Sequence, residues 1–118
     1  MASHYYQEAR GIRKSSAIIA VAVLNQAENL FLVGVGRTVI IRKIIIWNGQ
    51  AANAIVSIGI NVFPAAIANI IPNILAIVGF DSEWQEDMIP EVEINQNITV
   101  ASTVAGIEVQ IEVEEILI

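Results

Sequence analysis

The chain has 118 residues, which is the size of one domain. Hydrophobic residues make up 55% of it and charged residues 15%, so it carries too much apolar surface to remain intrinsically disordered. The absence of cysteine excludes disulfide scaffolds, thiol nucleophiles and cysteine-ligated metal sites. The formal net charge is −6, and all six basic residues lie within residues 1–43. This separation of charge along the chain has two interpretations. The charges lie on a solvated surface, or a basic arm docks on an acidic face of a neighbouring subunit.

Residues 1–16 are polar, aromatic and basic, and we predict that they form an extended N-terminal arm. The remainder, residues 17–118, is predicted to be a single β-sandwich domain. No long apolar segment directly follows a basic start, so we expect no secretory signal peptide. The sole imidazole, His4, falls in this arm and is expected to be solvated, because nothing there would hold it beside a nucleophile.

The aliphatic residues are mostly β-branched, with 23 Ile and 13 Val against five Leu. Such side chains are stiff at χ1 and are favoured in strands, which predicts an all-β fold. A domain of this size buries only about two-thirds of its unfolded surface. We therefore expect the surplus apolar surface to be covered by another copy of the chain or by a partner.

The predicted strands, in chain order, are residues 17–24, 30–35, 37–47, 54–62, 73–80, 91–94, 97–102 and 106–114. Arg42 and Lys43 are expected at a break or an edge. Asn48-Gly49 predicts a type I′ hairpin between the third and fourth of these strands. Residues 64–71 are predicted to be a short helical or irregular piece, interrupted by Pro72.

Seven to eight short strands without a long helix predict an antiparallel β-sandwich or barrel. The clearest alternation is in residues 106–114, where Ile and Val point to one face and Glu and Gln to the other. One face of that strand is therefore expected to be buried and the other to be wet and acidic. The apolar C-terminal residues 116–118 are expected to be tucked against the rest of the protein.

The sequence carries no catalytic, cofactor-binding or metal-binding pattern, and we expect the protein not to be an enzyme. The acidic segment Asp81–Asp87 is predicted to be a solvated loop in which Ser82 and Gln85 cap one helical turn. It lacks the spacing of an EF-hand calcium loop. Gly34-Val35-Gly36 is only a fragment of a dinucleotide fingerprint, because no third glycine and no helix follow.

Six residues are candidates for an interface, because aromatic and arginine side chains dominate interface energetics. They are Tyr5, Tyr6, Arg10, Arg13, Lys14 and Trp84. The arm also has residues suited to phosphates and bases, but the negative net charge disfavours nucleic acid as a partner. Residues 44–80 are uncharged, yet Asn and Pro interrupt them repeatedly, so a membrane-spanning helix is not expected.

The stretch RTVIIRKIIIWNGQAANAIVSIGI, residues 37–60, resembles the central hairpin of small jelly-roll virion proteins of the tumour-necrosis-factor-like type. Proteins of this kind decorate or cement the capsids of phages and archaeal viruses. Residues 106–114 resemble the closing strand of the same fold. The resemblance implies a homotrimer that binds a major capsid protein, a location in the virion after assembly in the host cytoplasm, and terminal arms used in docking.

The leading hypothesis is thus a structural protein that oligomerises and stabilises a larger shell, with no small-molecule substrate. One alternative is a lectin-like module that binds carbohydrate or calcium through Asp81–Asp87. Another is a pilin-like filament subunit that donates its apolar terminal strand to a neighbour. The Ile-rich, cysteine-free composition points to a thermophilic source, although nine Asn argue against it.

Overall fold

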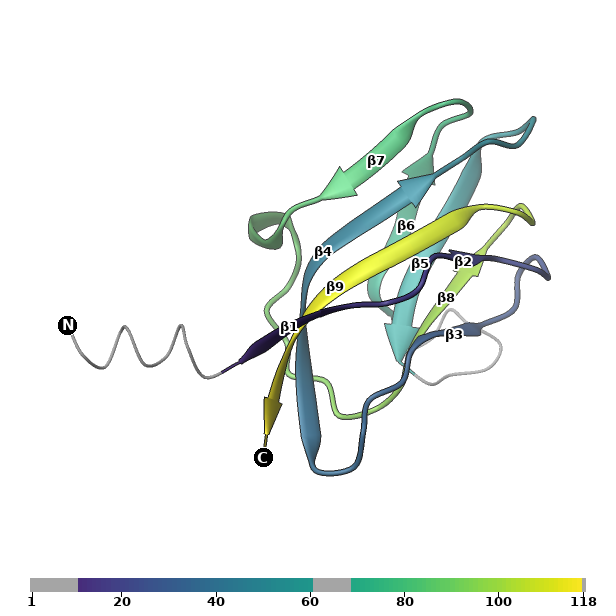
Figure 1. The fold of residues 1–118 in the computed structure, drawn as a ribbon. Helices are drawn as coiled ribbons and strands as arrows, with labels where there is room; N and C mark the ends of the chain where they lie inside the picture. The colour runs from purple at the N-terminus through teal and green to yellow at the C-terminus, as the bar shows by residue number, and fades with distance from the viewer. Residues whose placement is uncertain (1–10, 61–68, 118) are drawn as a thin grey trace.

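The computed structural model describes residues 11–60 and 69–117, which form nine strands and one 3₁₀ turn, η1 (Glu86–Met88). The strands are β1 (Ile12–Ser15), β2 (Ile19–Ala20), β3 (Glu28–Phe31), β4 (Arg37–Trp47), β5 (Ala54–Ile60), β6 (Asn69–Ala76), β7 (Asp81–Trp84), β8 (Ile98–Ser102) and β9 (Glu108–Leu117). They build two antiparallel sheets that pack face to face (Figure 1). The predicted all-β sandwich is confirmed, with nine strands in place of seven to eight.

Sheet A has the strand order β1-β9-β4-β7, and β2 also pairs with β9. Sheet B has the order β3-β8-β5-β6. Each strand after β2 lies in the opposite sheet to the strand that precedes it in the chain. The exception is β6, which follows β5 in sheet B. The chain therefore crosses repeatedly between the two layers, and the central strands of each sheet come from distant parts of the sequence.

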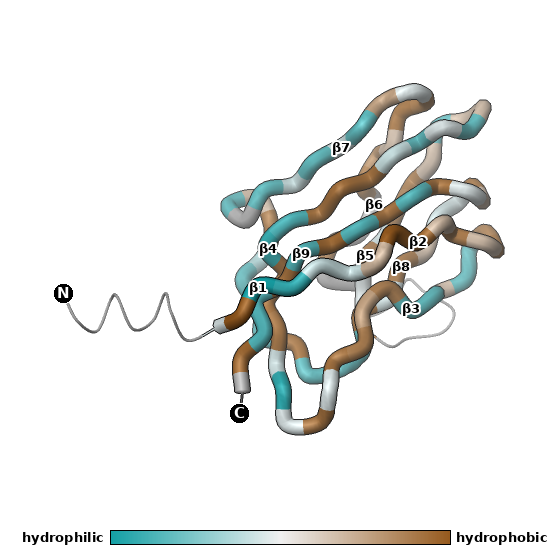
Figure 2. Tube along the Cα trace, in the orientation of Figure 1, coloured by the Kyte–Doolittle hydropathy of each residue, from teal (hydrophilic) through white to brown (hydrophobic). Residues whose placement is uncertain are grey.

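The core lies between the sheets and consists almost wholly of Ile and Val. Side chains of alternate residues point inward, as period two requires, and Figure 2 shows the matching alternation of apolar and polar residues along β9. The largest side chains that are no more than 2% exposed include Ile41, Ile44, Ile46, Val56, Ile58, Ile98, Val100, Val109 and Ile111. The buried face predicted for the last strand is thereby confirmed.

A β-bulge in β4 keeps both of its central charged residues out of the core. Ile41 pairs with Val113 and Lys43 with Glu112, so Arg42 is one extra residue on β4. The extra residue shifts the alternation, and Ile41 and Ile44 consequently both face the core. The break expected at Arg42 and Lys43 is confirmed. The bulge keeps the inner face of β4 apolar both before and after these two residues.

The hairpin predicted at Asn48-Gly49 is wrong. β4 and β5 lie in different sheets, and residues 48–53 carry the chain from one layer to the other. β4 has no free edge for β5, because Trp47 already pairs with Glu108 on one side and with Asp81 on the other. The competition from these two strands outweighs the local turn preference.

The predicted arm, residues 1–16, differs from the structure over its last part. Ile12–Ser15 form β1 on the chain's own β9, whereas residues 1–10 lie outside the described residues. Ser16 continues the edge: its N–H donates to the Ile111 carbonyl at 2.8 Å, and its Oγ accepts from the Ile111 N–H at 3.0 Å. Of the strand predicted over 17–24, only Ile19–Ala20 is formed.

Other boundaries differ in the middle of the chain. Asp81–Trp84 form strand β7 rather than a loop, because they pair with the end of β4. The single helical turn is η1, which begins after the expected caps. β6 begins earlier than predicted and includes Pro72, which is tolerated at the edge of sheet B. The irregular piece predicted over residues 64–71 lies outside the described part as far as residue 68. The strand predicted over residues 91–94 is reduced to one bridge, between Ile94 and Val39.

Two Ile→Ala variants test the assignment of the core. Ile111 is fully buried whereas Ile18 is 64% exposed, so the same atoms are removed in two environments. We expect Ile111→Ala to lower the free energy of unfolding by about 2–5 kcal/mol through lost burial and a residual cavity. Ile18→Ala should change it by less than about 0.5 kcal/mol. Urea denaturation measures both, and similar losses in the two variants would contradict the described core.

Candidate interaction surface

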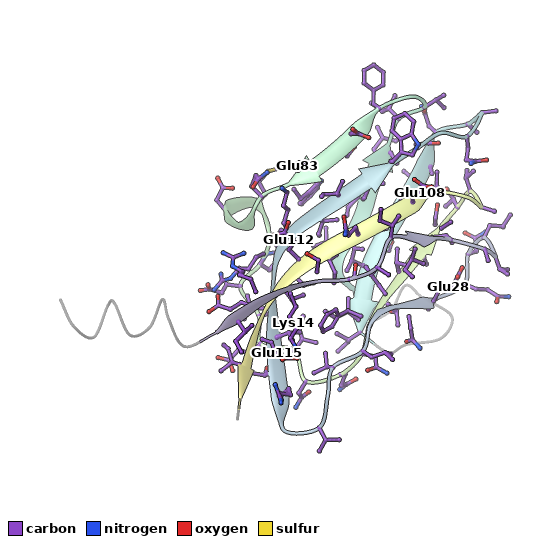
Figure 3. The ribbon with its side chains drawn as sticks, in the orientation of Figure 1. Lys14, Glu28, Glu83, Glu108, Glu112 and Glu115 are labelled. Carbon is purple, nitrogen blue, oxygen red and sulfur yellow. The ribbon has the colours of Figure 1, made fainter. Side chains whose placement is uncertain are left out.

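Charge is divided unequally between the two sheets. The strands of sheet B carry one charged residue, Glu28, whose carboxylate accepts hydrogen bonds from the N–H groups of Ala22 and Val23. The strands of sheet A carry the remaining charged residues that lie in strands, several of them labelled in Figure 3. They are Arg13, Lys14, Arg37, Arg42, Lys43, Asp81, Glu83, Glu108, Glu112, Glu114 and Glu115.

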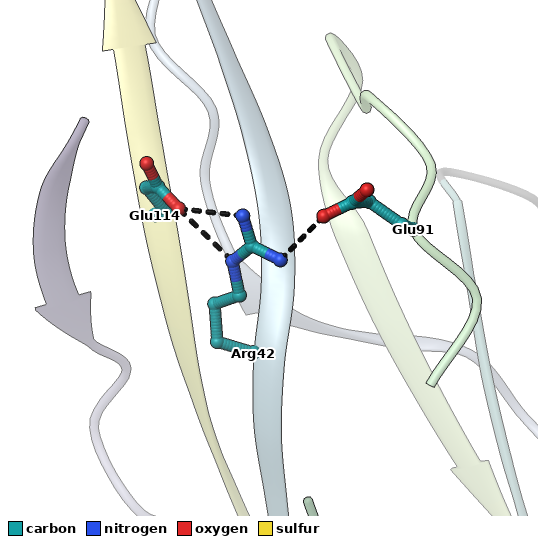
Figure 4. Close-up of polar contacts among 3 residues, drawn as sticks. All are labelled: Arg42, Glu91 and Glu114. Carbon is teal, nitrogen blue, oxygen red and sulfur yellow. Dashed lines mark hydrogen bonds and ion pairs between the residues drawn. The ribbon is translucent and has the colours of Figure 1, made fainter. Parts of the chain in front are cut away.

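On sheet A, Arg42 of β4 lies between two carboxylates (Figure 4). Its Nη2 and Nε lie 2.7 and 3.0 Å from Glu114 Oε1, and its Nη1 lies 2.7 Å from Glu91 Oε1. The Arg42 side chain is 18% exposed and that of Glu114 11%. Two charged groups so nearly removed from water are stable only as partners, so each requires the other to remain in place.

Glu115 is held between two bases because β9 lies between β1 and β4. Its Oε1 is 2.8 Å from Lys14 Nζ and 2.9 Å from Arg37 Nη1, and its side chain is 7% exposed. The hydrogen bond from Lys14 lowers the pKa of Glu115 below its ordinary value; burial opposes this shift, and the positive charges of Lys14 and Arg37 reinforce it. A carboxylate in this position is therefore ionised at neutral pH.

These ion pairs change the interpretation of the sorted charges. The bases of the early strands β1 and β4 pair with acids of the late strand β9 in the same chain. Neither a solvated surface nor docking between subunits is needed to account for Lys14, Arg37 and Arg42. Folding itself brings the basic and acidic halves together.

The structure describes three of the six predicted interface residues, and it does not bring those three into one surface. Tyr5, Tyr6 and Arg10 lie outside the described residues. Arg13 and Lys14 lie on β1 and Trp84 on β7, which are the opposite edges of sheet A. Trp84 is partly buried and packs against the core.

A different surface, at the end of the sandwich where β4 finishes, collects four connections (Figure 1, upper right). They are residues 21–27, 48–53, 77–80 and 103–107, and we call them the apolar end. Hydrogen bonds tie them in a row: Gly106 N–H to the Val21 carbonyl at 2.7 Å, Gln50 Nε2 to the Gly106 carbonyl at 3.3 Å, and Gly79 N–H to the Asn48 carbonyl at 2.8 Å. None of the four segments contains a charged residue.

Asn48 holds this end together. It is 0% exposed, and its Nδ2 donates to the carbonyls of Ala52 at 3.0 Å and Ala76 at 2.9 Å. Its Oδ1 accepts from the N–H of Gln50 at 2.9 Å. The sequence predicts Asn48 as a hairpin residue, whereas its side chain satisfies the backbone of its own connection and of the end of β6.

Large apolar side chains are concentrated at the apolar end. Fourteen large hydrophobic residues are exposed in the described part of the chain, and eight of them lie in these connections or on the strand residues beside them. They are Val23, Leu24, Trp47, Ile55, Leu75, Ile77, Val78 and Phe80. Of these, Phe80 is the most exposed, at 64%. Sequence reasoning did not single them out, because it assigned most of them to buried strands.

The acidic segment has a different environment from the one predicted. Glu83 lies on β7, with its carboxylate 3.8 Å from Lys43 Nζ and accepting a hydrogen bond from Gln85. Within residues 11–60 and 69–117, no three acidic or histidine side chains gather in a way that suits a metal ion. In the same residues the structure contains no helix long and apolar enough to cross a bilayer.

No protein-family model matches the chain, and no curated protein matches it in sequence. Among solved structures, it is similar to a Bacillus endospore appendage protein from a family of disulfide-linked pili. The TM-score is 0.55 and the sequence identity 8%, over 92% of this chain and 88% of that one. At this identity the likeness concerns the fold.

The role of Asn48 is testable with a matched pair of Asn→Ala variants. Asn48→Ala leaves buried backbone groups without partners, and we expect it to lower the free energy of unfolding by about 1–3 kcal/mol. Asn95→Ala, at an exposed position, should leave it within about 0.5 kcal/mol of wild type. Urea denaturation distinguishes the two, and equal stability of both variants would contradict the assigned role.

The lowered pKa of Glu115 predicts an acid-dependent loss of stability. Its ordinary value is 4.5, and the folded value lies below it. The stabilisation by ionised Glu115 is therefore fully present above pH 4.5 and is lost as the pH falls through the folded pKa. In Glu115→Gln this component is absent, so the stability gap to wild type should be largest near neutral pH and close in acid. Denaturation series across this range test it, with exposed Glu108→Gln as the control for removing one acidic charge; a gap independent of pH would refute the prediction.

Proposed function

We propose that this protein is a non-enzymatic structural subunit that associates with other copies of itself into a larger assembly. The apolar end is the observation that carries the proposal. Eight large apolar side chains are exposed at this one end, and its four connections contain no charge. Concentrated exposed apolar surface of this kind is typical of association sites, whose centres are depleted of charge.

The distribution of charge supports the same conclusion. Arg42 and Glu115 are already paired within sheet A, and the four connections of the apolar end contain no charge; the nearest acids, Asp81 and Glu108, lie on the adjoining strands beside Trp47. Burying an unpaired charge costs several kcal/mol, so the neutral end is the surface at which association is least opposed. The chain has no cysteine, so contacts between its copies would form without disulfides.

The strand order supports the proposal of a jelly roll. β1 and β2 share one edge position, so each layer has four positions, filled as β1/β2-β9-β4-β7 and β3-β8-β5-β6. Eight strands that alternate between two sheets in this manner are typical of jelly-roll proteins. Together with the resemblance of residues 37–60 and 106–114 to virion decoration proteins, this favours a trimer that binds a major capsid protein and stabilises the shell.

A filament subunit is the second candidate. The observation that favours it is the similarity in fold to the endospore appendage protein, which belongs to a family of disulfide-linked pili. Both candidates need contacts between copies, and they differ in whether the assembly closes. Electron microscopy of negatively stained protein separates closed particles from fibres. The lectin-like alternative has no described cluster of acidic residues that supports it.

Two Val→Lys variants test whether the apolar end mediates association. Val23 lies in the apolar end and is 48% exposed. Val92 lies between Glu91 and Glu93, before β8, and is 46% exposed. Both variants add the same charge at nearly equal exposure. We expect Val23→Lys to reduce the assembled mass measured by light scattering, because lysine would have to be desolvated at the contact. Val92→Lys should assemble as wild type does, and a wild-type chain that stays monomeric at high concentration would refute the proposal.

A further inference from the structure

The other end of the sandwich also exposes an apolar segment. The β3–β4 turn, residues 32–36, is uncharged, and its Leu32 and Val35 are 65% and 104% exposed. The turn is closed by the N–H of Arg37, which donates to the Gly34 carbonyl at 3.2 Å, and by Gly36, which adopts a φ of 75°. It projects below the two sheets in Figure 1. Val35 in particular makes no contribution to the core of its own molecule.

The turn and the apolar end cannot meet within one molecule. β4 begins at the turn with Arg37 and ends at the apolar end with Trp47. At about 3.3 Å per residue, a strand of this length separates its two ends by roughly 33 Å. Among the described residues, neither of these two apolar surfaces can therefore cover the other.

We propose that copies of this chain associate head to tail, with the β3–β4 turn of one copy packed against the apolar end of the next. This inference rests on the proposed self-association and specifies its interface. One contact of this kind covers Leu32 and Val35 together with exposed side chains such as Phe80 and Val78. It is also neutral on both sides, because neither segment contains a charged residue.

The outer side of sheet A fits the apolar end less well than the turn does. The outer side of sheet A presents partly exposed charged groups, including Lys43 and Glu83 at 29% and 48%. Covering them with apolar side chains would take them out of water without new partners. A symmetric contact between two apolar ends avoids that cost but leaves Leu32 and Val35 uncovered. A head-to-tail contact covers both apolar segments, and neither segment contains a charge.

A head-to-tail contact has a consequence for the assembly as a whole. The two surfaces differ, so a bound pair of copies retains one free turn and one free apolar end. Addition then continues until the chain of subunits closes into a ring or grows as a fibre. A symmetric contact would stop at two copies.

The absence of native cysteine allows a specific cross-linking test. Val35→Cys and Phe80→Cys place single thiols at exposed positions on the turn and on the apolar end. Each variant is assembled alone, then mixed in equal amounts, and the double variant is assembled separately. A short bis-maleimide reagent is added, and the products are separated by denaturing electrophoresis. Circular dichroism and light scattering establish folding and assembly of every sample before cross-linking, and Val92→Cys serves as an exposed control.

We expect no cross-linked product from either single variant, dimers from the mixture and a ladder of covalent oligomers from the double variant. Dimers from Phe80→Cys alone would show a symmetric contact and overturn the head-to-tail arrangement while leaving self-association intact. Assembled protein that gives no product in the mixture would also overturn it, by showing that copies meet elsewhere. Monomeric protein in every sample would instead refute the proposed function itself.

Discussion

The pairing of β4 with β9 is the interaction on which the rest of the structure depends. The two strands run antiparallel from Arg37 opposite Leu117 to Trp47 opposite Glu108. Their inward side chains supply much of the Ile and Val core. Their charged side chains place the bases of the early sequence beside the acids of the late sequence, so that Arg42 meets Glu114 and Arg37 meets Glu115. One ladder thus provides both the hydrophobic layer and the neutralisation of buried charge.

Features that depend on residue type and local periodicity could be predicted from the sequence. The excess of Ile and Val over Leu indicated an all-β fold, and the alternation in residues 106–114 identified the inward face of β9. The limits of β4 and its break at Arg42 and Lys43 were also predictable, because a charged pair inside an apolar strand leaves few other solutions. The first of these signals is the composition of the whole chain, and the others are each contained within one strand.

Features that depend on competition between distant segments were not predictable. Asn48-Gly49 has the sequence of a tight hairpin, yet β9 and β7 occupy both edges of β4 and exclude β5. Residues 12–15 appeared too polar and basic for the domain, and only the carboxylates of β9 account for their place on sheet A. The apolar end was missed for the same reason: four connections far apart in the sequence become one surface only after the sheets form.

The position of β9 also bears on how the protein folds. β9 is synthesised after the other eight strands, yet it occupies a central position in sheet A, next to β4. Until it emerges, β4 presents an unpaired edge, a state in which strands of separate nascent chains are prone to pair with one another. Completion of sheet A therefore competes with aggregation of nascent chains on the ribosome, and this topology requires completion to be the faster process.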